Sequence, residues 1–432
     1  MGLDRTRWAE VLVGLDRMRV LEVARDSCGR VHVAVETTEG SARCDGCGDG
    51  ARVKDRARVA LADLPVFGAP VTLVWVKRRW CCLDGDCSVG TWTEDRPDIA
   101  PARAAMTKRA GLWATREVGA EVHTVAYAAA QLGVAWHTVM DAVAYWGAAL
   151  VDDPERVGDS KAVGVDETKL AAAKRDQRTK WMTAICDIEQ RHVLDVIEGR
   201  QGPELSEWLG ERPERWRLGV TSTVTDLHEP YRKSLRAHLP NAVAVADPFH
   251  VVGVANRALD NTRRRVQQET RGHRGRKDDP LYRSRKLLAM GEERLDSDTR
   301  TKLGDLLIAG DPNGEVHEAW SVKESVRDLY TMWGDQEGAT WSLDMLIAYC
   351  RSSTAAEIRG LARTLKQWRH AIVAWHATGH SNGPVEGLNS QIKKIKRVAA
   401  GFRKFTHYRL RILLACGRCN WELLGTPPRS NA

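Results

Sequence analysis

Short apolar runs separated by polar turns occupy the middle of the chain and predict a sheet. Each run has the length of a strand rather than of a helix. Two stretches with helical spacing separate the last three runs. The predicted strands are 162–166, 181–187, 192–197, 219–226 and 242–247, and the predicted helices are 203–209 and 230–238.

Three consecutive strands followed by strand–helix repeats are the element order of the ribonuclease H-like fold. In that topology the first strand lies centrally, beside the fourth. Asp166 ends the first predicted strand and Asp226 ends the fourth, so we expect their carboxylates side by side at one edge of the sheet. Two like charges at that spacing need a counter-charge, which a divalent metal supplies.

Three other aspartates near strand ends compete for this role. Asp247 ends the outer fifth strand and is followed by Pro-Phe-His250, so we expect Asp247 and His250 to support the site from beside it. Asp187 and Asp195 are expected at turns or on the surface.

A helical pattern between 382 and 397 carries one carboxylate and then only basic charges. Pro384 suits the first helical position. The apolar positions repeat at intervals of three and four and form one face, which consists of Val385, Leu388, Ile392 and Ile395. A neighbouring face carries Glu386, Asn389, Lys393 and Lys396. This face could hold a metal and phosphates, or Glu386 could simply compensate the helix dipole; the segment alone leaves both interpretations open.

The stretch 251–375 has a helical pattern and is too long for a loop. We interpret it as an all-helical domain inserted between the fifth strand and the Glu386 helix. It contains five tryptophans, most of which we expect in its core, with stacking on an unpaired base as the alternative for one of them. These are Trp320, Trp333, Trp341, Trp368 and Trp375.

Five of the ten cysteines lie between residues 44 and 87. Cys44 and Cys47 form one closely spaced pair, and Cys82 and Cys87 form another beyond a strand-like run at 71–80. Two cysteine pairs on turns predict a structural tetrathiolate zinc site in a ribbon that depends on the metal for folding. Cys81 could replace Cys82, and a small core with unligated thiols is the alternative.

Two short helical stretches, 124–132 and 136–146, flank a turn that contains a glycine. This pattern predicts a DNA-binding helix-turn-helix, with Trp136, His137 and Thr138 facing DNA at the start of the second helix. An ordinary helical hairpin gives the same pattern.

The net charge of +8 is modest for a chain of 432 residues, but the basic residues are clustered. Residues 390–411 contain eight lysines or arginines and no acid, and residues 263–286 contain ten basic residues against three acids. Such clusters favour a polyanionic partner, although each alone could be a solvated helix face. With no signal peptide pattern and no long apolar run, we expect a cytoplasmic protein with reduced cysteines that binds no membrane.

The order of these motifs resembles the ISL-three family of bacterial insertion-sequence transposases. The resemblance rests on the cysteine ribbon, the helix-turn-helix and the motifs Val-Asp166-Glu-Thr, Thr-Asp226, Asp247-Pro-Phe-His250, Asn382-Gly-Pro-Val-Glu386-Gly-Leu-Asn389 and Ile-Lys-Lys-Ile-Lys-Arg397. It implies a catalytic triad of Asp166, Asp226 and Glu386, with Asp247 and His250 supporting the site.

We therefore expect a DDE transposase that binds the inverted repeats at the ends of its element, cuts the DNA and joins it to a target. The triad would hold two Mg²⁺ or Mn²⁺ ions. The expected contacts with phosphates near the cleaved bond are Lys393, Lys396 and Arg397, and Asn389 and Arg403 are also expected to bind DNA. A dimer or larger assembly on DNA is expected, associated with the bacterial nucleoid. The alternatives are an inactive zinc and helix-turn-helix regulator and a ribonuclease acting on RNA–DNA hybrids.

The expected fold class is a multidomain α/β protein. The predicted segments are a β-rich zinc-ribbon domain at 1–100, a helix-turn-helix domain at 101–158, the first part of a ribonuclease H-like core at 159–250, an all-helical insertion at 251–378, and the second part of the core at 379–432.

Overall fold

A computed structural model describes residues 5–171 and 179–427 of the chain. The chain is a mixed α/β protein with two compact units, one formed by 1–157 with 391–432 and the other by 158–390. In the described ranges, none of the helices combines the length and the apolar character needed to cross a bilayer.

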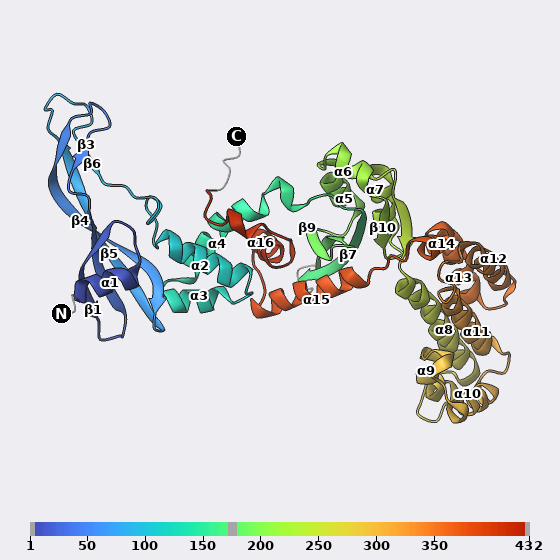
Figure 1. Cartoon of the computed structure of the whole chain (residues 1–432). Helices are drawn as coiled ribbons and strands as arrows, with labels where there is room; N and C mark the ends of the chain where they lie inside the picture. Colours follow the sequence, from blue (N-terminus) through green and yellow to red (C-terminus); the bar gives the residue numbers. More distant parts are fainter. Residues whose placement is uncertain (1–4, 172–178, 428–432) are drawn as a thin grey trace. The chain divides into compact units, whose positions relative to one another are not determined.

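The first unit begins with helix α1 (Arg5–Val13) and a six-stranded sheet (Figure 1). Its strands are β1 (Met18–Arg25), β2 (Val31–Thr37), β3 (Ala42–Arg43), β4 (Gly50–Val66), β5 (Ala69–Cys82) and β6 (Thr91–Thr93). Strands β4 and β5 form a long antiparallel hairpin, while β2 pairs with β5 in parallel. Leu73 and Trp75 of β5 are fully buried in an apolar core with β1 and β2. The sheet therefore has an apolar core of its own, and the metal dependence of the ribbon stays a prediction.

Four helices complete this unit: α2 (Lys108–Gly119), α3 (Val125–Leu132), α4 (Trp136–Val151) and α16 (Phe405–Cys416). The predicted pair of helices around a turn corresponds to α3 and α4. Thr124 caps the N-terminus of α3 by accepting from the Tyr127 N–H, and Gly133 ends it in the left-handed conformation. Helix α16 packs against α2 and α4.

The second unit is built on a five-stranded sheet (Figure 1). Its elements are β7 (Ala162–Ala171), β8 (Lys180–Asp187), β9 (His192–Glu198), α5 (Gly202–Gly210), α6 (Glu214–Gly219), β10 (Ser222–Thr225), α7 (Glu229–His238) and β11 (Val243–Ala246). The strand order is β11-β10-β7-β8-β9. Strand β10 is parallel to β7 and to β11, whereas β8 is antiparallel to β7 and β9. All five predicted strands are present, and the fourth is shorter than predicted because α6 occupies its start.

Two expectations about the aspartates were wrong. Asp166 lies inside β7 rather than at its end, because β7 continues along β8 beyond the point where β10 stops. Asp187 ends β8 beside the turn at 188–191, which is one of the two expected places, whereas Asp195 lies inside β9; both are buried rather than at the surface. Asp187 accepts from the Ser160 hydroxyl at 2.6 Å, and Asp195 accepts from the Trp208 indole N–H at 3.0 Å, so both carboxylates are paired inside the fold.

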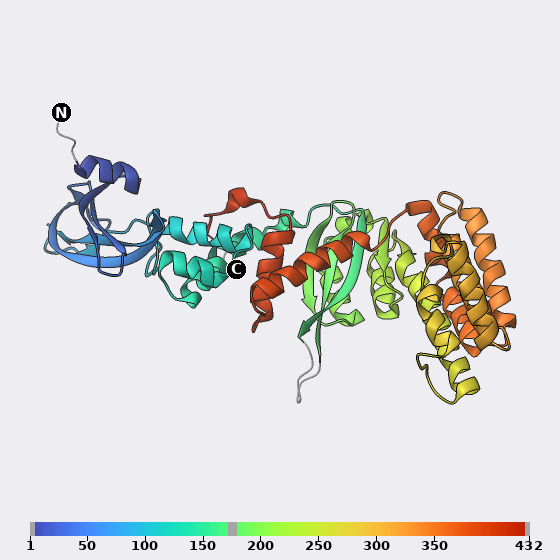
Figure 2. The same ribbon diagram turned by 90° about the horizontal axis from the view of Figure 1, so that it is seen from below.

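Helices α8 to α14 follow β11 and form an apolar-cored bundle, seen in both views (Figures 1 and 2). They are α8 (Pro248–Arg271), α9 (Pro280–Ala289), α10 (Ser297–Gly310), α11 (Glu315–Leu329), α12 (Gln336–Ser352), α13 (Ala356–Gln367) and α14 (Arg369–Thr378). Helix α14 packs against β11, and the chain then enters α15 (Gly383–Val398).

The tryptophans of this bundle are more exposed than predicted. Of the five, only Trp368 is fully buried, whereas Trp333 and Trp341 are 58% and 67% exposed. Trp333 still contacts Trp375 edge-to-face and lies over Gly379. The expectation that most of them form the core was therefore wrong, since a tryptophan can cover a surface as well as fill an interior.

Candidate active site

The sheet brings Asp166 and Asp226 together. Val165 and Thr225 are register partners in the parallel pair β7–β10, so the two aspartates that follow them are neighbours. Burial, and then the charge of Asp226, raise the pKa of Asp166 to about 6. The Glu167 N–H donates to Asp166 Oδ1 at 2.8 Å. An acidic pair of this kind is unfavourable unless a cation or hydrogen-bond donors compensate it.

Asp247 and His250 flank the pair, as predicted from their positions in the sequence. Asp247 directly follows β11 and caps α8 by accepting from the His250 N–H. His250 Nδ1 lies 2.9 Å from both Asp226 Oδ1 and Asp247 Oδ2. Hydrogen bonds to Asp226 and Asp247 raise the pKa of His250 to about 10, so the imidazole is cationic at neutral pH. It therefore compensates part of the acidic charge.

Helix α15 returns to the sheet and donates to both aspartates. The Asn382 side-chain amide donates to Asp226 Oδ1 at 3.1 Å, and its backbone N–H donates to Asp247 Oδ1 at 2.7 Å. The Asn389 amide donates to Asp166 Oδ2 at 2.6 Å. Asn382 and Asn389 are 0% and 2% exposed. The two amides thus hold the carboxylates from one helix.

Asn389 was predicted to contact DNA, and that role is not retained. Its side chain is buried and its N–H group is directed at Asp166, so it is not available at the surface. The role of Asn382 was missed. The spacing of seven residues between Asn382 and Asn389, two helical turns, was the available signal, since it places both on one face.

Glu386 lies between these two asparagines on the first turn of α15 and is exposed. In the described part of the chain, the carboxylate oxygens of Glu386, Asp166 and Asp226 do not all lie within 4.8 Å of one another, the distance expected for three ligands of one metal ion. The structure therefore brings two members of the predicted triad together and anchors the helical turn of the third beside them.

A small residue allows this close approach of helix and strand. A Cβ atom on Gly164 of β7 would lie 2.6 Å from Ile188 Cγ2 and closer still to Val385 Cγ2, distances that real Cβ atoms do not adopt. Only glycine permits α15 to lie at this distance from β7.

An open hollow of about 280 Å³ adjoins Asp226 and His250. Glu167 and Arg257 also line it, and neither was predicted from the sequence. Glu167 directly follows Asp166 in β7, and Arg257 lies two turns beyond His250 in α8, so their proximity depends on the fold rather than on a motif.

The residues here suit a divalent cation. Carboxylate oxygens are the donors that Mg²⁺ and Mn²⁺ prefer. In the described part of the chain, the side-chain oxygens of Asn382 and Asn389 are buried without a hydrogen-bond donor. Buried acceptors are normally satisfied, and the water shell of a hydrated cation would satisfy these.

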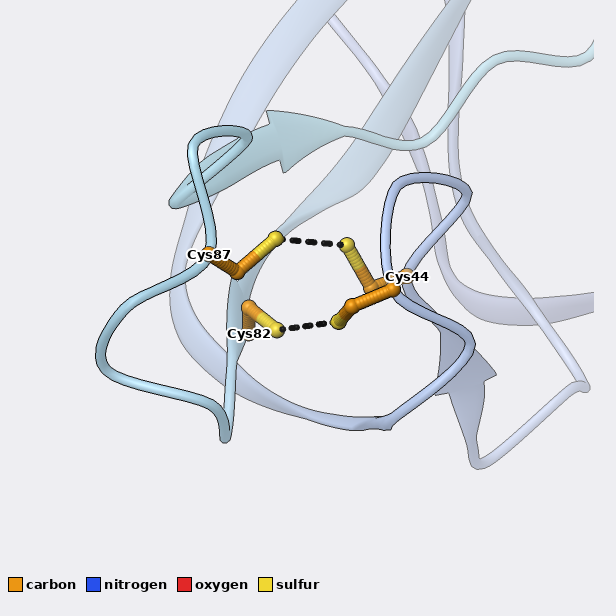
Figure 3. Close-up of side chains that lie close together, drawn as sticks. Cys44, Cys82 and Cys87 are labelled. Carbon is orange, nitrogen blue, oxygen red and sulfur yellow. Dashed lines mark hydrogen bonds between the residues drawn. The ribbon is translucent and has the colours of Figure 1, made fainter.

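The four predicted zinc ligands come together at the far end of the β4–β5 hairpin (Figure 3). The sulfur atoms of Cys44 and Cys87 are 3.6 Å apart, and those of Cys47 and Cys82 are 3.4 Å apart. The backbone N–H groups of Cys47 and Gly46 lower the pKa of Cys44 to about 7, whereas the neighbouring thiols raise the pKa of Cys47 to about 12 and burial raises that of Cys82. Cys81 is not part of this group, and its thiol faces the Cys82 carbonyl oxygen. Such a cluster is compatible with a zinc ribbon.

The remaining predicted DNA contacts lie at or near the surface of the first unit. Trp136 is 50% exposed at the start of α4, next to an exposed His137 and a half-buried Thr138. Lys396 is half-buried, and the other predicted cations are exposed, namely Lys393, Arg397 and Arg403. These positions leave the predicted DNA contacts possible without testing them.

Comparisons with known proteins identify the family of this chain. A family model described as "Transposase", for the ISL-three group of DDE transposases, matches residues 163–412. The transposase for insertion sequence element IS1557 of Mycobacterium tuberculosis is 26% identical over 93% of this chain and 93% of its own length. The transposase for insertion sequence element IS1001 of Bordetella parapertussis is 25% identical over 96% of this chain and 95% of its own length. With the matched region covering more than half of the chain and the whole central sheet, the chain belongs to the ISL-three family of DDE-type transposases.

Proposed function

We propose that this chain is an active transposase, which binds the terminal inverted repeats of an insertion sequence, cleaves the DNA and transfers the cut strand to a target. The observation that best supports this is the pair of hydrogen bonds from Asn382 and Asn389 to Asp226 and Asp166. A regulator without catalytic activity would not need two buried amides to hold an acidic pair, because such a pair costs stability. The catalytic function is therefore favoured over the inactive regulator.

The sheet order supports a ribonuclease H-like core, since the strand bearing Asp166 is central and parallel to the strand preceding Asp226. A ribonuclease acting on RNA–DNA hybrids would share that core. The ribonuclease alternative, however, does not explain the N-terminal cysteine cluster and the helix pair α3–α4. We retain the division into a ribbon, a helix-turn-helix domain and a core split by a helical insertion.

Asp166, Asp226 and Glu386 would hold two Mg²⁺ or Mn²⁺ ions. When bound, such ions activate a water or a 3′-hydroxyl group for attack at phosphorus and stabilise the leaving oxygen. The chain positions the ligands: Asn389 fixes the carboxylate of Asp166, and Asn382 fixes that of Asp226. Glu386 is exposed and would turn toward the aspartate pair when substrate is bound.

His250 would keep its proton during the reaction. Its Nδ1–H is shared between Asp226 and Asp247, and these hydrogen bonds raise its pKa to about 10. It is therefore a fixed cation that orients Asp226 rather than a base that exchanges protons near neutral pH.

The first unit would recognise the transposon ends. Cys44, Cys47, Cys82 and Cys87 would hold a structural Zn²⁺. Trp136, His137 and Thr138 would contact bases from the start of α4, and the exposed cations of α15 and the segment after it would bind phosphates. Because two ends must be joined in one reaction, we expect a dimer or larger assembly on DNA.

The test is metal-dependent cleavage of a duplex that carries a transposon end. Glu386→Gln and Asp166→Asn should keep binding to that duplex and lose cleavage. A matched control is Glu207→Gln, which changes an exposed glutamate of α5 that does not line the hollow beside Asp226. Normal cleavage by Glu386→Gln would refute the triad, and the absence of end binding in the unaltered protein would refute the function.

A further inference from the structure

One polar face of α8 runs from the candidate active site along the helical insertion. His250, Arg257, Asn261 and Arg264 are separated by seven, four and three residues, so they lie on the same side of the helix. The opposite side is buried and packs against α11 and α13. Helix α8 is therefore a rigid support with one face available to a partner.

Arginines line neighbouring hollows between α8 and α9. A groove of about 480 Å³ is lined by Arg257, Arg263, Arg264 and Arg285. A second groove of about 380 Å³ shares Arg263, Arg264 and Arg285 and adds Arg274. Arg257 also lines the hollow beside Asp226 and His250. We call the surface formed by Arg257, Arg263, Arg264, Arg274 and Arg285 the arginine groove.

The arginine groove is poorly neutralised by the protein itself. Asp260 is the acidic residue that lines it, and it pairs with Arg263 at 2.5 Å and with Arg264 at 2.8 Å. Within residues 5–171 and 179–427, Arg257, Arg274 and Arg285 form no ion pair with a carboxylate. The Arg285 guanidinium is instead held 3.8 Å above the Tyr282 ring. Arg263 is buried and held by Asp260 and Gln267, which leaves four more accessible arginines in the groove. Four such cations in a concave surface attract a polyanion.

We propose that the arginine groove binds the phosphate backbone of duplex DNA next to the cleavage site, without reading its sequence. This proposal rests on the proposed function, because Arg257 lines both the groove and the hollow beside Asp226, where the phosphodiester would react. The 24 residues of α8 span about 36 Å, the length of about ten base pairs. The planar guanidinium group of arginine can donate two parallel hydrogen bonds to phosphate oxygens. Several arginines in a row fit a polymer with repeating phosphates better than a small anion.

The experiment measures how salt weakens the binding of a fluorescent mixed-sequence DNA duplex to the full-length protein, in EDTA so that no cleavage occurs. Each phosphate contact contributes about 0.9 to the slope of log affinity against log salt concentration. The test variant is Arg264→Ala with Arg285→Ala. The matched control is Arg271→Ala with Arg283→Ala, which removes two exposed arginines from the same two helices outside the groove.

The test variant should lower the slope by about 2 and weaken binding equally for a transposon end and a mixed sequence. The control should keep the slope of the unaltered protein. Arg264→Lys with Arg285→Lys keeps the charges and should restore most of the slope, which separates loss of contacts from misfolding. Equal slopes for test and control would overturn the groove proposal and leave the proposed function standing. No DNA binding by the unaltered protein would overturn both, and preference for an acidic peptide over DNA would overturn the choice of partner.

Discussion

Replacing Gly164 with alanine tests whether the close contact between β7 and α15 shapes the active site. The added Cβ would lie 2.6 Å from Ile188 Cγ2 and closer still to Val385 Cγ2, whereas ordinary contacts are 3.4–4 Å. All of these atoms are buried, so the methyl group has no open space to occupy. The helix must move away from the strand, and Asn382 and Asn389 move with it.

The contact distance sets the size of the effect. Restoring a normal distance requires a shift of roughly 1 Å, and overpacking of a core by one methyl group typically costs about 1–3 kcal/mol. Alanine recovers about 0.4–1 kcal/mol by restricting the unfolded chain, which leaves a net loss of roughly 1–2 kcal/mol. A misplacement of about 1 Å can reduce catalysis by about a hundredfold, so cleavage should fall more than stability.

Hydrogen exchange followed by mass spectrometry reports this local change directly. Peptides from β7 and from residues 383–390 should lose protection by about 5- to 30-fold, which corresponds to 1–2 kcal/mol. The cleavage rate is measured on the same preparation. Gly387→Ala is the matched control, because a Cβ at that exposed position of α15 meets nothing within 4 Å and should leave both readouts unchanged or slightly improved.

Trimming the opposing side chain should relieve the clash. Val385→Ala removes the methyl group nearest to the new Cβ. The loss of unfolding free energy in the double variant Gly164→Ala/Val385→Ala should therefore be smaller than the sum of the losses in the two single variants. The reasoning is refuted if Gly164→Ala behaves like Gly387→Ala in both readouts, or if the double variant shows no coupling.

Three further predictions concern the ligands of the two candidate metal sites. Asn389→Leu removes the hydrogen-bond donor to Asp166, and a buried charge-assisted hydrogen bond is worth about 1.5–3 kcal/mol. The cleavage rate should therefore fall at least tenfold while binding to the transposon end is unchanged. Full activity in a cleavage assay would contradict the positioning role of Asn389. The pKa of Asp166 is about 6 in the folded protein, whereas that of an unfolded aspartate is 3.8. Protonated Asp166 therefore stabilises the metal-free fold below pH 4, and this contribution is lost as the pH rises through 6. Mg²⁺ competes with that proton, so calorimetry should show affinity falling by up to tenfold per pH unit below 6, and a constant affinity would exclude Asp166 as a ligand. Removing zinc with a chelator should increase hydrogen exchange in β3 and β6 while Trp75 stays buried; loss of the Trp75 core would show that the whole sheet depends on the metal.

Periodicity and residue chemistry were sufficient to predict the central strands, the paired aspartates and the clustering of four cysteines. They could not predict side-chain contacts. An apolar stretch indicates burial but not how far a strand pairs on each side, which is why Asp166 was placed at the end of a strand that continues past it. Asn389 shares a face with Lys393 in the sequence, yet the packing of α15 on β7 buries Asn389 and leaves Lys393 exposed. This difference in exposure arises from the contact between α15 and β7, and the spacing of residues within α15 does not predict that contact.

The hydrogen bond between the Asn382 N–H and Asp247 Oδ1 joins two residues that are 135 positions apart. The two ends of the helical insertion therefore meet the sheet beside the same carboxylate, and α14 packs against β11 there. A segment attached in this way acts as a detachable module, because its length does not alter the geometry at its base. Doubling the length of such a loop costs only about 0.6 kcal/mol in closure entropy. Evolution or protein engineering can thus vary the helices farther along the insertion, such as α9 and α10, while His250 of α8 and the contact of α14 with β11 stay in place.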